Sequence, residues 1–549
     1  MGIANLLLDR GLVTRAQLDD ALARQRTTGE RLDRVLLRMG LVGADQILEI
    51  IGSQFHMQVV DLQQLEVKPE VLAVLPAKLV YKQNCVPIAK ENGTLTVATS
   101  DPSGLDELKL LTGCSIEVVL ADEEELRKFI RANYGVGGDT LDEMSAGLAP
   151  QLAESGKDEE QAQEASVIKL VNDILIEAVT ERATDVHIEP YEKELTVRYR
   201  IDGVLQRANV PPTINRFGAA IISRIKIMAS LNIAEKRKPQ DGRITFKHRT
   251  QEFDLRASII PMLFGEGIVM RILSKSAVLM NLADLGMPKN VQESWEKLID
   301  RPHGILLVTG PTGSGKSTTL YASLNKIVSD EIKVITVEDP VEYHVPGVNQ
   351  IQVNHKVGLD FAAGLRSILR HDPDVVMIGE IRDKETAETA IQASLTGHLV
   401  FSTLHTNDSA GATTRLLDMG VEPFLVASSV EGIMAQRLVR RVCAECGKPY
   451  VPDRADLPAS FEHAAGLELV RGTGCKACRN TGYRGRVGIY ELLRITEEIR
   501  EMIMERKNAP RISASAMASG DMFTLREDGF VKAKSGVTTI EEVMRAMTT

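Results

Sequence analysis

The stretch "LLVTGPTGSGKSTTLY", residues 306–321, decides the fold of the region around it. An apolar, strand-like run ends at a glycine, four residues follow, and Gly315-Lys316-Ser317 opens a segment of helical character. Glycines let the backbone turn tightly, so that several N–H groups can point at a phosphate. Lys316 would reach the β- and γ-phosphates, and the Ser317 hydroxyl would bind Mg²⁺. The expected nucleotide-binding residues are Gly310, Pro311, Thr312, Gly313, Ser314, Gly315, Lys316, Ser317 and Thr318.

Three more strand-like segments, "KVITV", "DVVMIG" and "LVFST", follow this loop and are separated by helical stretches. That alternation predicts an α/β fold with a parallel sheet, whose ligands bind beyond the carboxyl ends of the strands. Glu338, Glu380 and His405 stand at those ends, where Mg·ATP would also lie. Glu380 could act through Mg²⁺ or as a base, Glu338 could orient or deprotonate the attacking water, and His405 could sense the γ-phosphate. The sequence leaves the division of roles between the two glutamates open.

The composition indicates a globular protein of several domains. The chain has 549 residues, enough for three or four domains, and a net charge of −10, which gives no global attraction to DNA or RNA. No apolar run reaches the about 18–20 residues that a membrane span needs. The start "MGIANLLLDRG" lacks the features of a signal peptide. We therefore expect a cytoplasmic protein whose cysteines are reduced or bound to a metal.

The N-terminal domain, expected over residues 1–134, begins with a tandem repeat. Residues 2–25 and 31–54 superpose position for position, each as a short helix, a glycine stop and a longer amphipathic helix. Short strands and helices then alternate, with a hairpin turn at Asn92-Gly93. Residues 135–164, rich in Gly, Gln and acidic side chains, are predicted to form a flexible linker.

The rest of the chain divides into four expected parts. Residues 165–275 predict an α+β domain in which the Asp202-Gly203 turn joins two strands of a mixed sheet. The nucleotide core is expected over 276–440, a cysteine-bearing insert over 441–485 and a helical C-terminal part over 486–549.

Four of the six cysteines predict a metal site. Cys443 and Cys446 form one C-x-x-C pair, Cys475 and Cys478 form another, and two such pairs suit a tetrahedral zinc site. Four thiolates leave no ligand position for water, so the role should be structural. Cys85 and Cys114 lie outside any pair, and we expect them in the core.

Eight segments stand in the order of a known family. They are "ATDVHIEP", "VRYRIDG", "AEKRKPQDGRI", "GPTGSGKSTTLY", "VEDPVEY", "LRHDPDVVMIGEIRD", "TGHLVFSTLHTND" and "CKACRNTGYRGRVGIYELL". Together they closely resemble the secretion and pilus-assembly traffic ATPases over about residues 166–549. The resemblance implies a RecA-like P-loop NTPase core preceded by a PAS-like domain, and a homohexamer under the cytoplasmic membrane. It also implies that ATP hydrolysis drives an inner-membrane platform protein, which adds pilin-like subunits to a filament.

The resemblance also assigns residues. "VEDPVEY" matches the acidic box of the family and gives Glu338 and Glu342, and "DVVMIGE" matches its Walker B segment and gives Glu380, a magnesium-site residue together with Ser317. "GHLVFSTLH" matches the histidine box. The family also uses arginines of the second domain across the active site. For Arg198 and Arg200 the alternative is that they form an exposed polar strand face, since both point the same way from one strand. The histidines and the candidate arginines are His398, His405, Arg198, Arg200, Arg216 and Arg224.

The front repeat resembles a module that binds cyclic-di-GMP in some family members. Their unit begins Arg-Leu-Gly, whereas this chain has Gly2-Ile3-Ala4 in the first copy and Arg31-Leu32-Asp33 in the second. The first copy thus lacks an arginine for a phosphate, and Asp33 adds a repelling charge. A docking domain for a membrane-associated adaptor is therefore the favoured interpretation, and cyclic-di-GMP binding is the alternative.

Several functions compete for this pattern. A motor ATPase of type II secretion, which drives pseudopilus assembly, is the leading interpretation, and the type IV pilus extension ATPase shares every motif. A nucleic-acid translocase is disfavoured by the acidic balance and by the lack of a basic-aromatic stretch. A nucleotide-gated scaffold with little turnover is disfavoured by the intact Lys316, Glu338 and Glu380.

Overall fold

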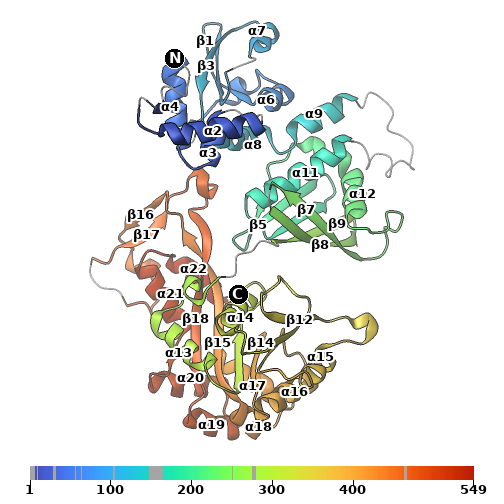
Figure 1. The fold of residues 1–549 in the computed structure, drawn as a ribbon, viewed down its shortest axis with the longest axis vertical. Coiled ribbons are helices and arrows are strands. Elements are labelled where there is room, and N and C mark those ends of the chain that lie inside the picture. The colour runs from blue at the N-terminus through green and yellow to red at the C-terminus, as the bar shows by residue number, and fades with distance from the viewer. Residues whose placement is uncertain are drawn as a thin grey trace. The chain divides into compact units, whose positions relative to one another are not determined.

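The computed structural model divides into two compact units, Met1–Ile272 and Leu273–Thr549 (Figure 1). It describes residues 7–8, 10–28, 32–55, 57–62, 65–102, 105–147, 165–249, 251–274, 280–462 and 466–548. The boundary lies close to the one expected at residue 275. The first unit, however, joins the expected N-terminal and second domains into one body.

The repeat at the start of the chain is visible in the backbone. Gly11 and Gly40 both adopt left-handed φ angles, 66° and 67°, which glycine reaches without a steric penalty. The N–H of the residue after each glycine donates to the carbonyl five residues before it, at 3.0 Å in the first copy and 3.2 Å in the second. The helices of this part are α2 (Arg15–Thr28), α3 (Leu32–Arg38) and α4 (Ala44–Phe55).

A three-stranded sheet follows the repeat. Strands β1 (Cys85–Glu91) and β2 (Thr94–Thr99) form the hairpin expected at Asn92-Gly93, and β3 (Ser115–Leu120) pairs parallel to β2. Cys85 and Cys114 are buried in its core, as expected, and burial raises the pKa of Cys85 to about 12. The helices around this sheet are α5 (Pro69–Leu72), α6 (Ala77–Gln83), α7 (Asp106–Thr112) and α8 (Glu123–Tyr134).

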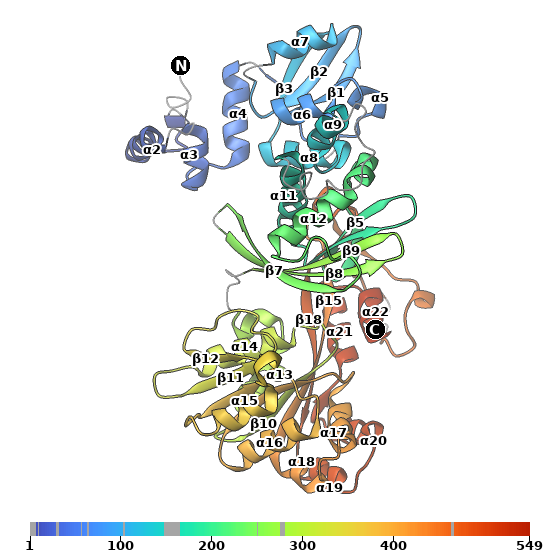
Figure 2. The ribbon, with the colours of Figure 1, turned by 90° about the vertical axis from the view of Figure 1, so that its right-hand side faces the viewer.

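Part of the predicted flexible linker is instead an ordered helix, so that prediction is wrong for residues 138–147. Helix α9 (Gly138–Gly147) lies against α6 and α11 (Ala165–Thr180), which Figure 2 shows. Leu141 is fully buried, and the backbone N–H of Val136 donates to the carbonyl of Asn209 at 2.8 Å. The burial of a few apolar side chains on one face of α9 thus stabilises the helix despite the glycines and acidic residues in this segment. Residues 148–164 lie outside the described residues.

The second domain is a six-stranded sheet in the order β6-β5-β4-β9-β8-β7. Strands β5 and β6 form the hairpin expected at Asp202-Gly203. The pairs β4–β5, β4–β9, β5–β6 and β7–β8 are antiparallel, whereas a mixed sheet was expected. Helices α11 and α12 bury their apolar sides with this sheet. The elements are β4 (Asp185–Pro190), β5 (Leu195–Ile201), β6 (Val204–Arg207), α12 (Gly218–Met228), β7 (Gln240–His248), β8 (Gln251–Met262) and β9 (Gly265–Ser274).

The second unit is built on an eight-stranded sheet in the order β12-β11-β13-β14-β10-β15-β18-β19. Its first six strands pair in parallel, as predicted, and the crossovers that join them along the chain carry a helix in all cases but β11–β12. Two of them, β12 and β15, are not among the strands predicted from the sequence. The six parallel strands are β10 (Gly304–Thr309), β11 (Val334–Glu338), β12 (Val348–Gln352), β13 (Val375–Ile378), β14 (Leu399–Leu404) and β15 (Val430–Val442).

Helices pack on both sides of this sheet, because the central strands β10, β11, β13 and β14 are buried along their whole length. They are α13 (Lys289–Ile299), α14 (Lys316–Ile327), α15 (Phe361–Ile368), α16 (Lys384–Leu395), α17 (Ser409–Asp418) and α18 (Pro423–Ser429).

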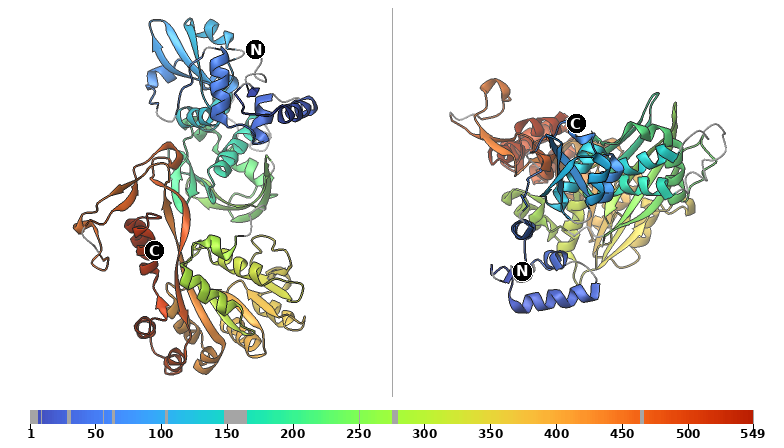
Figure 3. Two further views of the ribbon diagram at one scale, coloured as in Figure 1. Left: turned by 60° about the vertical axis from the view of Figure 1, so that its left-hand side comes forward. Right: turned by 90° about the horizontal axis from the view of Figure 1, so that it is seen from above.

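The cysteine-bearing insert and the C-terminal part are not as separate as expected. Strand β18 (Tyr483–Arg494) leaves the insert and pairs antiparallel with β15 along a long ribbon (Figure 3, left). Residues 486–494 are therefore sheet, which corrects the all-helical expectation. The remaining elements are β16 (Gly447–Tyr450), β17 (Leu469–Gly472), α19 (Glu497–Met504), α20 (Ala509–Ala518), β19 (Met522–Phe523), α21 (Leu525–Lys534) and α22 (Ile540–Thr548).

Among the helices in the described ranges, none combines the length and the hydropathy that crossing a lipid bilayer requires.

Candidate functional site

The phosphate loop lies between β10 and α14, as the sequence predicts. Gly310, Gly313 and Gly315 have φ angles of 147°, 80° and 90°, which side-chain-bearing residues rarely adopt. A Cβ on Gly310 would lie 2.5 Å from the carbonyl oxygen of Gln436, and one on Gly315 would lie 2.7 Å from the Gln436 side chain. The loop is therefore closed tightly on β15, and only glycine fits at these two positions.

Lys316 bends back over this loop. Its Nζ donates to the carbonyl oxygens of Gly310 at 2.8 Å and Pro311 at 3.1 Å. Burial lowers the pKa of Lys316 to about 8, an effect that Glu380 opposes and Arg437 reinforces. A bound phosphate would favour the charged lysine and so raise this pKa again.

Glu380 and His405 meet at the carboxyl edge of the sheet. Glu380 follows β13, His405 follows β14, and Nε2 of His405 lies 3.0 Å from Oε2 of Glu380. The other carboxylate oxygen accepts from Arg382. Burial by itself would raise the pKa of Glu380, but Arg382 and His405 outweigh it and lower the pKa. This carboxylate therefore stays ionised at neutral pH, as a metal ligand or a base requires.

Glu338 has a different setting at the end of β11. It is buried and accepts hydrogen bonds from three side chains, those of Tyr321, Thr336 at 2.6 Å and Gln350 at 3.1 Å. Burial raises its pKa, and the three hydrogen bonds oppose that rise. Glu338 thus lies at the predicted edge, but its oxygens are already engaged.

The two histidines assigned by the histidine box lie at opposite ends of one strand. His398 precedes β14, and its Nδ1 lies 2.9 Å from the carbonyl oxygen of Ala393 at the end of α16. The two histidines flank the six residues of β14 and are therefore seven steps apart, so at about 3.3 Å per step their backbones lie about 23 Å apart. The structure therefore places His405, and not His398, at the nucleotide edge.

Three residues that the sequence interpretation missed also line this edge. Arg382 holds Glu380, Gln436 accepts from Thr319 on α14 at 2.7 Å, and Arg437 donates to the carbonyl of Asn407 at 2.9 Å. Arg382 stands two residues after Glu380, so proximity could have indicated it. Gln436 and Arg437 belong to β15, whose place beside β10 no local pattern indicates.

The arginine candidates of the second domain are held by acids of the same sheet. Arg198 is paired with Glu189, and Nε of Arg200 lies 3.5 Å from Asp185. Arg271 on β9, which the sequence interpretation missed, donates to the same Asp185 at 3.0 Å and keeps 53% of its side chain exposed. The remaining candidates differ in exposure, since Arg216 is exposed and Arg224 is half-buried.

The four predicted metal ligands converge. The Sγ atoms of Cys443 and Cys475 are 3.8 Å apart, as are those of Cys446 and Cys478, and all four lie within 4.8 Å of one another. Zinc–sulfur bonds of about 2.3 Å in a tetrahedron place the sulfurs about 3.8 Å apart, so the cluster fits that ion. Backbone N–H groups of Cys475 and Gly482 donate to Cys478 Sγ at 3.2 Å, which stabilises a thiolate.

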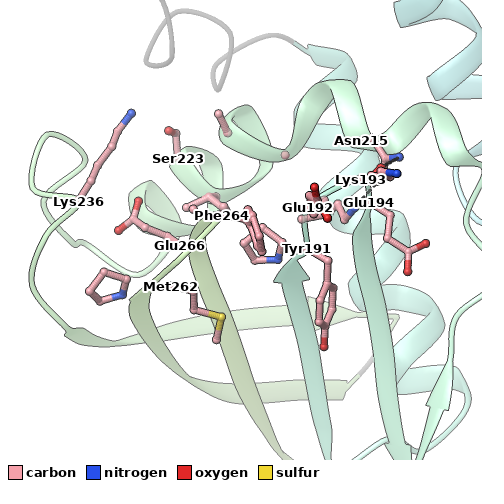
Figure 4. Close-up of a pocket in the computed structure, with 17 residues that line it drawn as sticks. Tyr191, Glu192, Lys193, Glu194, Asn215, Ser223, Lys236, Met262, Phe264 and Glu266 are labelled. Atoms are coloured by element: carbon pink, nitrogen blue, oxygen red, sulfur yellow. Dashed lines mark hydrogen bonds between the residues drawn. The ribbon is translucent and has the colours of Figure 1, made fainter.

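A cavity of about 440 Å³ lies in the first unit, away from every predicted site residue (Figure 4). The β4–β5 turn, the start of α12 and the β8–β9 turn line it, with Tyr191 and Phe264 on its wall. Of the lining residues, Glu266 has its Oε1 2.6 Å from Nζ of Lys226, and both residues are buried. This pair satisfies its own charges, as a buried ion pair must.

Comparison with known proteins decides the family. A family model described as type II/IV secretion system protein matches residues 160–545, and a model of the MshEN domain matches residues 55–140. The chain belongs to the type II/IV secretion system protein family. The expected resemblance is thereby confirmed.

Relatives of the family extend over the whole chain. The type II secretion system protein E of Xanthomonas campestris pv. campestris is 43% identical over 99% of this chain and 98% of its own length. The type IV pilus assembly ATPase PilB of Myxococcus xanthus is 41% identical over the same shares. The structure of the Legionella pneumophila ATPase DotB covers 69% of this chain and 95% of its own, with a TM-score of 0.52 and 22% identity, and shows likeness of fold. The RecA-like fold and the ATPase class of this family member are thus confirmed.

Proposed function

We propose that this chain is the cytoplasmic motor ATPase of a type II secretion system and drives pseudopilus assembly. The observation that carries the proposal is the meeting of Lys316, Glu380 and His405 at one sheet edge, in a chain that aligns end to end with a type II secretion protein E. A type IV pilus extension motor is the second candidate, because the pilus ATPase PilB aligns over an equal share of the chain. Deleting the gene and assaying both secreted protein and surface pili separates the two.

The residues of the edge suit Mg·ATP. The turn of the phosphate loop offers backbone N–H groups to the phosphates, Lys316 adds a positive charge, and Ser317 and Glu380 would hold the magnesium ion. The ion would neutralise phosphate charge. Glu380, kept ionised by Arg382 and His405, is the residue we assign to orient the attacking water. The closed cysteine cluster would hold a structural zinc ion and so fasten the insert to the end of β15.

We further propose that the motor is a homohexamer in which one subunit supplies an arginine to a neighbour's nucleotide. The candidates are Arg198, Arg200 and Arg271, of which Arg271 is the most exposed. An arginine at the transferring phosphate contributes about 10³–10⁵ in rate in other phosphoryl-transfer enzymes. Because such a site is incomplete in one chain, hydrolysis would depend on assembly.

The test is ATPase rate per subunit against protein concentration. Wild type should become faster per subunit as concentration rises, and Arg271→Ala or Arg200→Ala should stay slow and flat. Arg207→Ala is the matched control, because Arg207 lies on the same sheet, is 64% exposed and is paired with Glu194. A concentration-independent rate that none of these substitutions changes contradicts the proposal of an assembly-gated site.

For residues 1–134 we propose docking to a membrane adaptor, with cyclic-di-GMP binding as the second candidate. The match to the MshEN domain and the paired glycine stops support a module of this kind. Gly2-Ile3-Ala4 and Arg31 lie outside the described residues. Titrating the full-length protein with cyclic-di-GMP by calorimetry tests the alternative, and no heat at high micromolar concentration rejects it.

Binding to the adaptor and to the platform protein would keep the motor at the inner face of the membrane. Sedimentation with membranes that contain or lack the adaptor checks this location. We propose no nucleic-acid partner, and hydrolysis stimulated by DNA or RNA would overturn that part.

A further inference from the structure

Tyr321 joins the phosphate-loop helix to the acidic strand end. It lies on α14, five residues after Lys316, and its hydroxyl donates to Oε2 of Glu338 at the end of β11. Only 1% of the Tyr321 residue surface is exposed, and Glu338 is 4% exposed. A hydrogen bond between a buried hydroxyl and a carboxylate is stronger than one between neutral groups. This hydrogen bond therefore joins α14, which begins at the phosphate loop, to the end of β11.

The same hydroxyl also accepts from the chain that follows Glu338. The backbone N–H of Glu342 donates to the Tyr321 oxygen at 3.3 Å. The Tyr321 and Tyr343 rings meet edge to face with centroids 4.5 Å apart. Tyr321 thus contacts the acidic strand end and the loop of residues 339–347 together.

Gln350 on β12 also binds the loop of residues 339–347. Its Nε2 donates to Oε1 of Glu338 at 3.1 Å and to the carbonyl of Tyr343 at 3.2 Å, and its Oε1 accepts from the N–H of Val345 at 2.9 Å. Glu338 is the centre of this network, because both of its oxygens accept from it. An ionised carboxylate suits the position, since it only accepts hydrogen bonds.

The two glutamates of the edge therefore have different settings. Glu380 faces Arg382 and His405, two side chains that are each more than half exposed. Glu338 faces a tyrosine, a threonine and a glutamine within the buried side of the edge. A general base needs an oxygen that its water can reach. Both glutamates have each oxygen in contact with a neighbouring side chain, but 16% of the Glu380 side chain is exposed, whereas Glu338 is only 4% exposed, so water reaches Glu380 more readily.

We infer that Tyr321 is a positioning residue for ATP hydrolysis, which anchors the ionised Glu338 and through it the loop 339–347 to the phosphate-loop helix. In this arrangement Glu338 shapes the edge and leaves water activation to Glu380. The inference rests on the ATPase activity proposed above. A nucleotide that shifts α14 would move the acidic loop with it, because the Tyr321 hydroxyl bonds to both.

The decisive variant is Tyr321→Phe, which removes one oxygen and keeps the ring contact with Tyr343. In the full-length protein we expect kcat to fall about tenfold, the factor that corresponds to one lost hydrogen bond to a charged group, while KM for ATP stays within about twofold. Tyr343→Phe is the matched control. Among the hydrogen bonds of the described residues, none involves the Tyr343 hydroxyl, so its removal should leave the rate unchanged.

The pH dependence of kcat distinguishes a positioning role of Tyr321 from a role in stability alone. The ionisable groups that face Glu338 are Tyr321 on α14 and Glu342 and Tyr343 on the loop. The Tyr321 hydrogen bond stabilises the ionised carboxylate, so its loss raises the pKa of Glu338. The acidic limb of the kcat profile should therefore move to higher pH in Tyr321→Phe and stay in place in Tyr343→Phe.

A double variant tests whether Tyr321 acts through Glu338. Glu338→Gln should lower kcat, and adding Tyr321→Phe to it should cost less than twofold more, since the coupled partner is already lost. Unchanged kcat and pH profile in Tyr321→Phe, with only a lower melting temperature, would overturn the inference. Fully additive effects in the double variant would overturn it too. A wild type without ATPase activity would instead refute the proposed function.

Discussion

His405 and Glu380 touch across two adjacent parallel strands, with Nε2 of the histidine 3.0 Å from Oε2 of the carboxylate. Arg382 binds the opposite oxygen, so the carboxylate is held from both sides. The pair links the strand that carries the proposed metal ligand to the strand that ends beside the phosphate loop. We therefore expect a displacement of one strand end to displace the other.

Glu380→Gln should separate binding from hydrolysis. The amide keeps the shape of the side chain but cannot act as a base or carry the negative charge, so kcat should fall by about 10²–10⁴. ATP should still bind with an affinity within a few-fold of wild type, because the phosphate loop is intact. Single-turnover hydrolysis and binding of a fluorescent ATP analogue measure the two effects. A variant that hydrolyses ATP at the wild-type rate would remove Glu380 from catalysis.

ATP affinity should weaken above about pH 8. Burial lowers the pKa of Lys316 to about 8 in the free protein, and the phosphates require the protonated form. As pH rises through that value the proton must be taken up on binding, so the apparent Kd should rise by up to about tenfold per pH unit. Lys316→Arg is the control, because arginine stays charged over this range. Its affinity is expected to be lower, and it should not vary with pH between 7 and 9.

The cysteine cluster should hold one zinc ion per chain. Metal analysis of the purified protein should give a ratio near one, and Cys446→Ser should lose most of it, because three thiolates bind zinc more weakly than four. The variant should also melt at lower temperature, since binding to the folded site stabilises it. Cys85→Ser is the control, since Cys85 lies in a different core and should leave the zinc content unchanged. A protein purified without zinc whose stability chelators do not change would contradict the prediction.

Helix α9 should contribute to the stability of the first unit. Leu141 is fully buried between α9 and its neighbours, and Leu141→Ala should lower the free energy of unfolding by about 2–5 kcal/mol. Leu263→Ala, at a leucine that is 88% exposed in the same unit, should change it by less than about 0.5 kcal/mol. Denaturant titration monitors both. If both substitutions change the free energy of unfolding by the same small amount, residues 138–147 behave as a linker and the prediction is wrong.

Local sequence patterns predicted those features of the structure that depend on a few neighbouring residues. The glycines of the phosphate loop, the Asn92-Gly93 and Asp202-Gly203 turns and the spacing of the cysteines each depend on a few consecutive residues. The linker prediction was wrong for α9 because its composition favours disorder, whereas Leu141 gains its stability from α6 and α11. By contrast, the strand-like run "LVFST" predicted between His398 and His405 is confirmed by β14, which places the two histidines at its opposite ends.

The sequence by itself determined the family, the phosphate-loop motif, the four cysteines of the predicted metal site and the strand ends at which Glu338, Glu380 and His405 stand. Each of these follows from residue type and spacing along the chain. Only the tertiary structure decided that Arg382 and His405 hold Glu380, that Tyr321 holds Glu338, and that Gln436 closes the loop from β15. Apart from the near neighbours Arg382 and Glu380, those contacts join residues that lie far apart in the chain, and packing in three dimensions, which depends on the whole chain, brings them within reach.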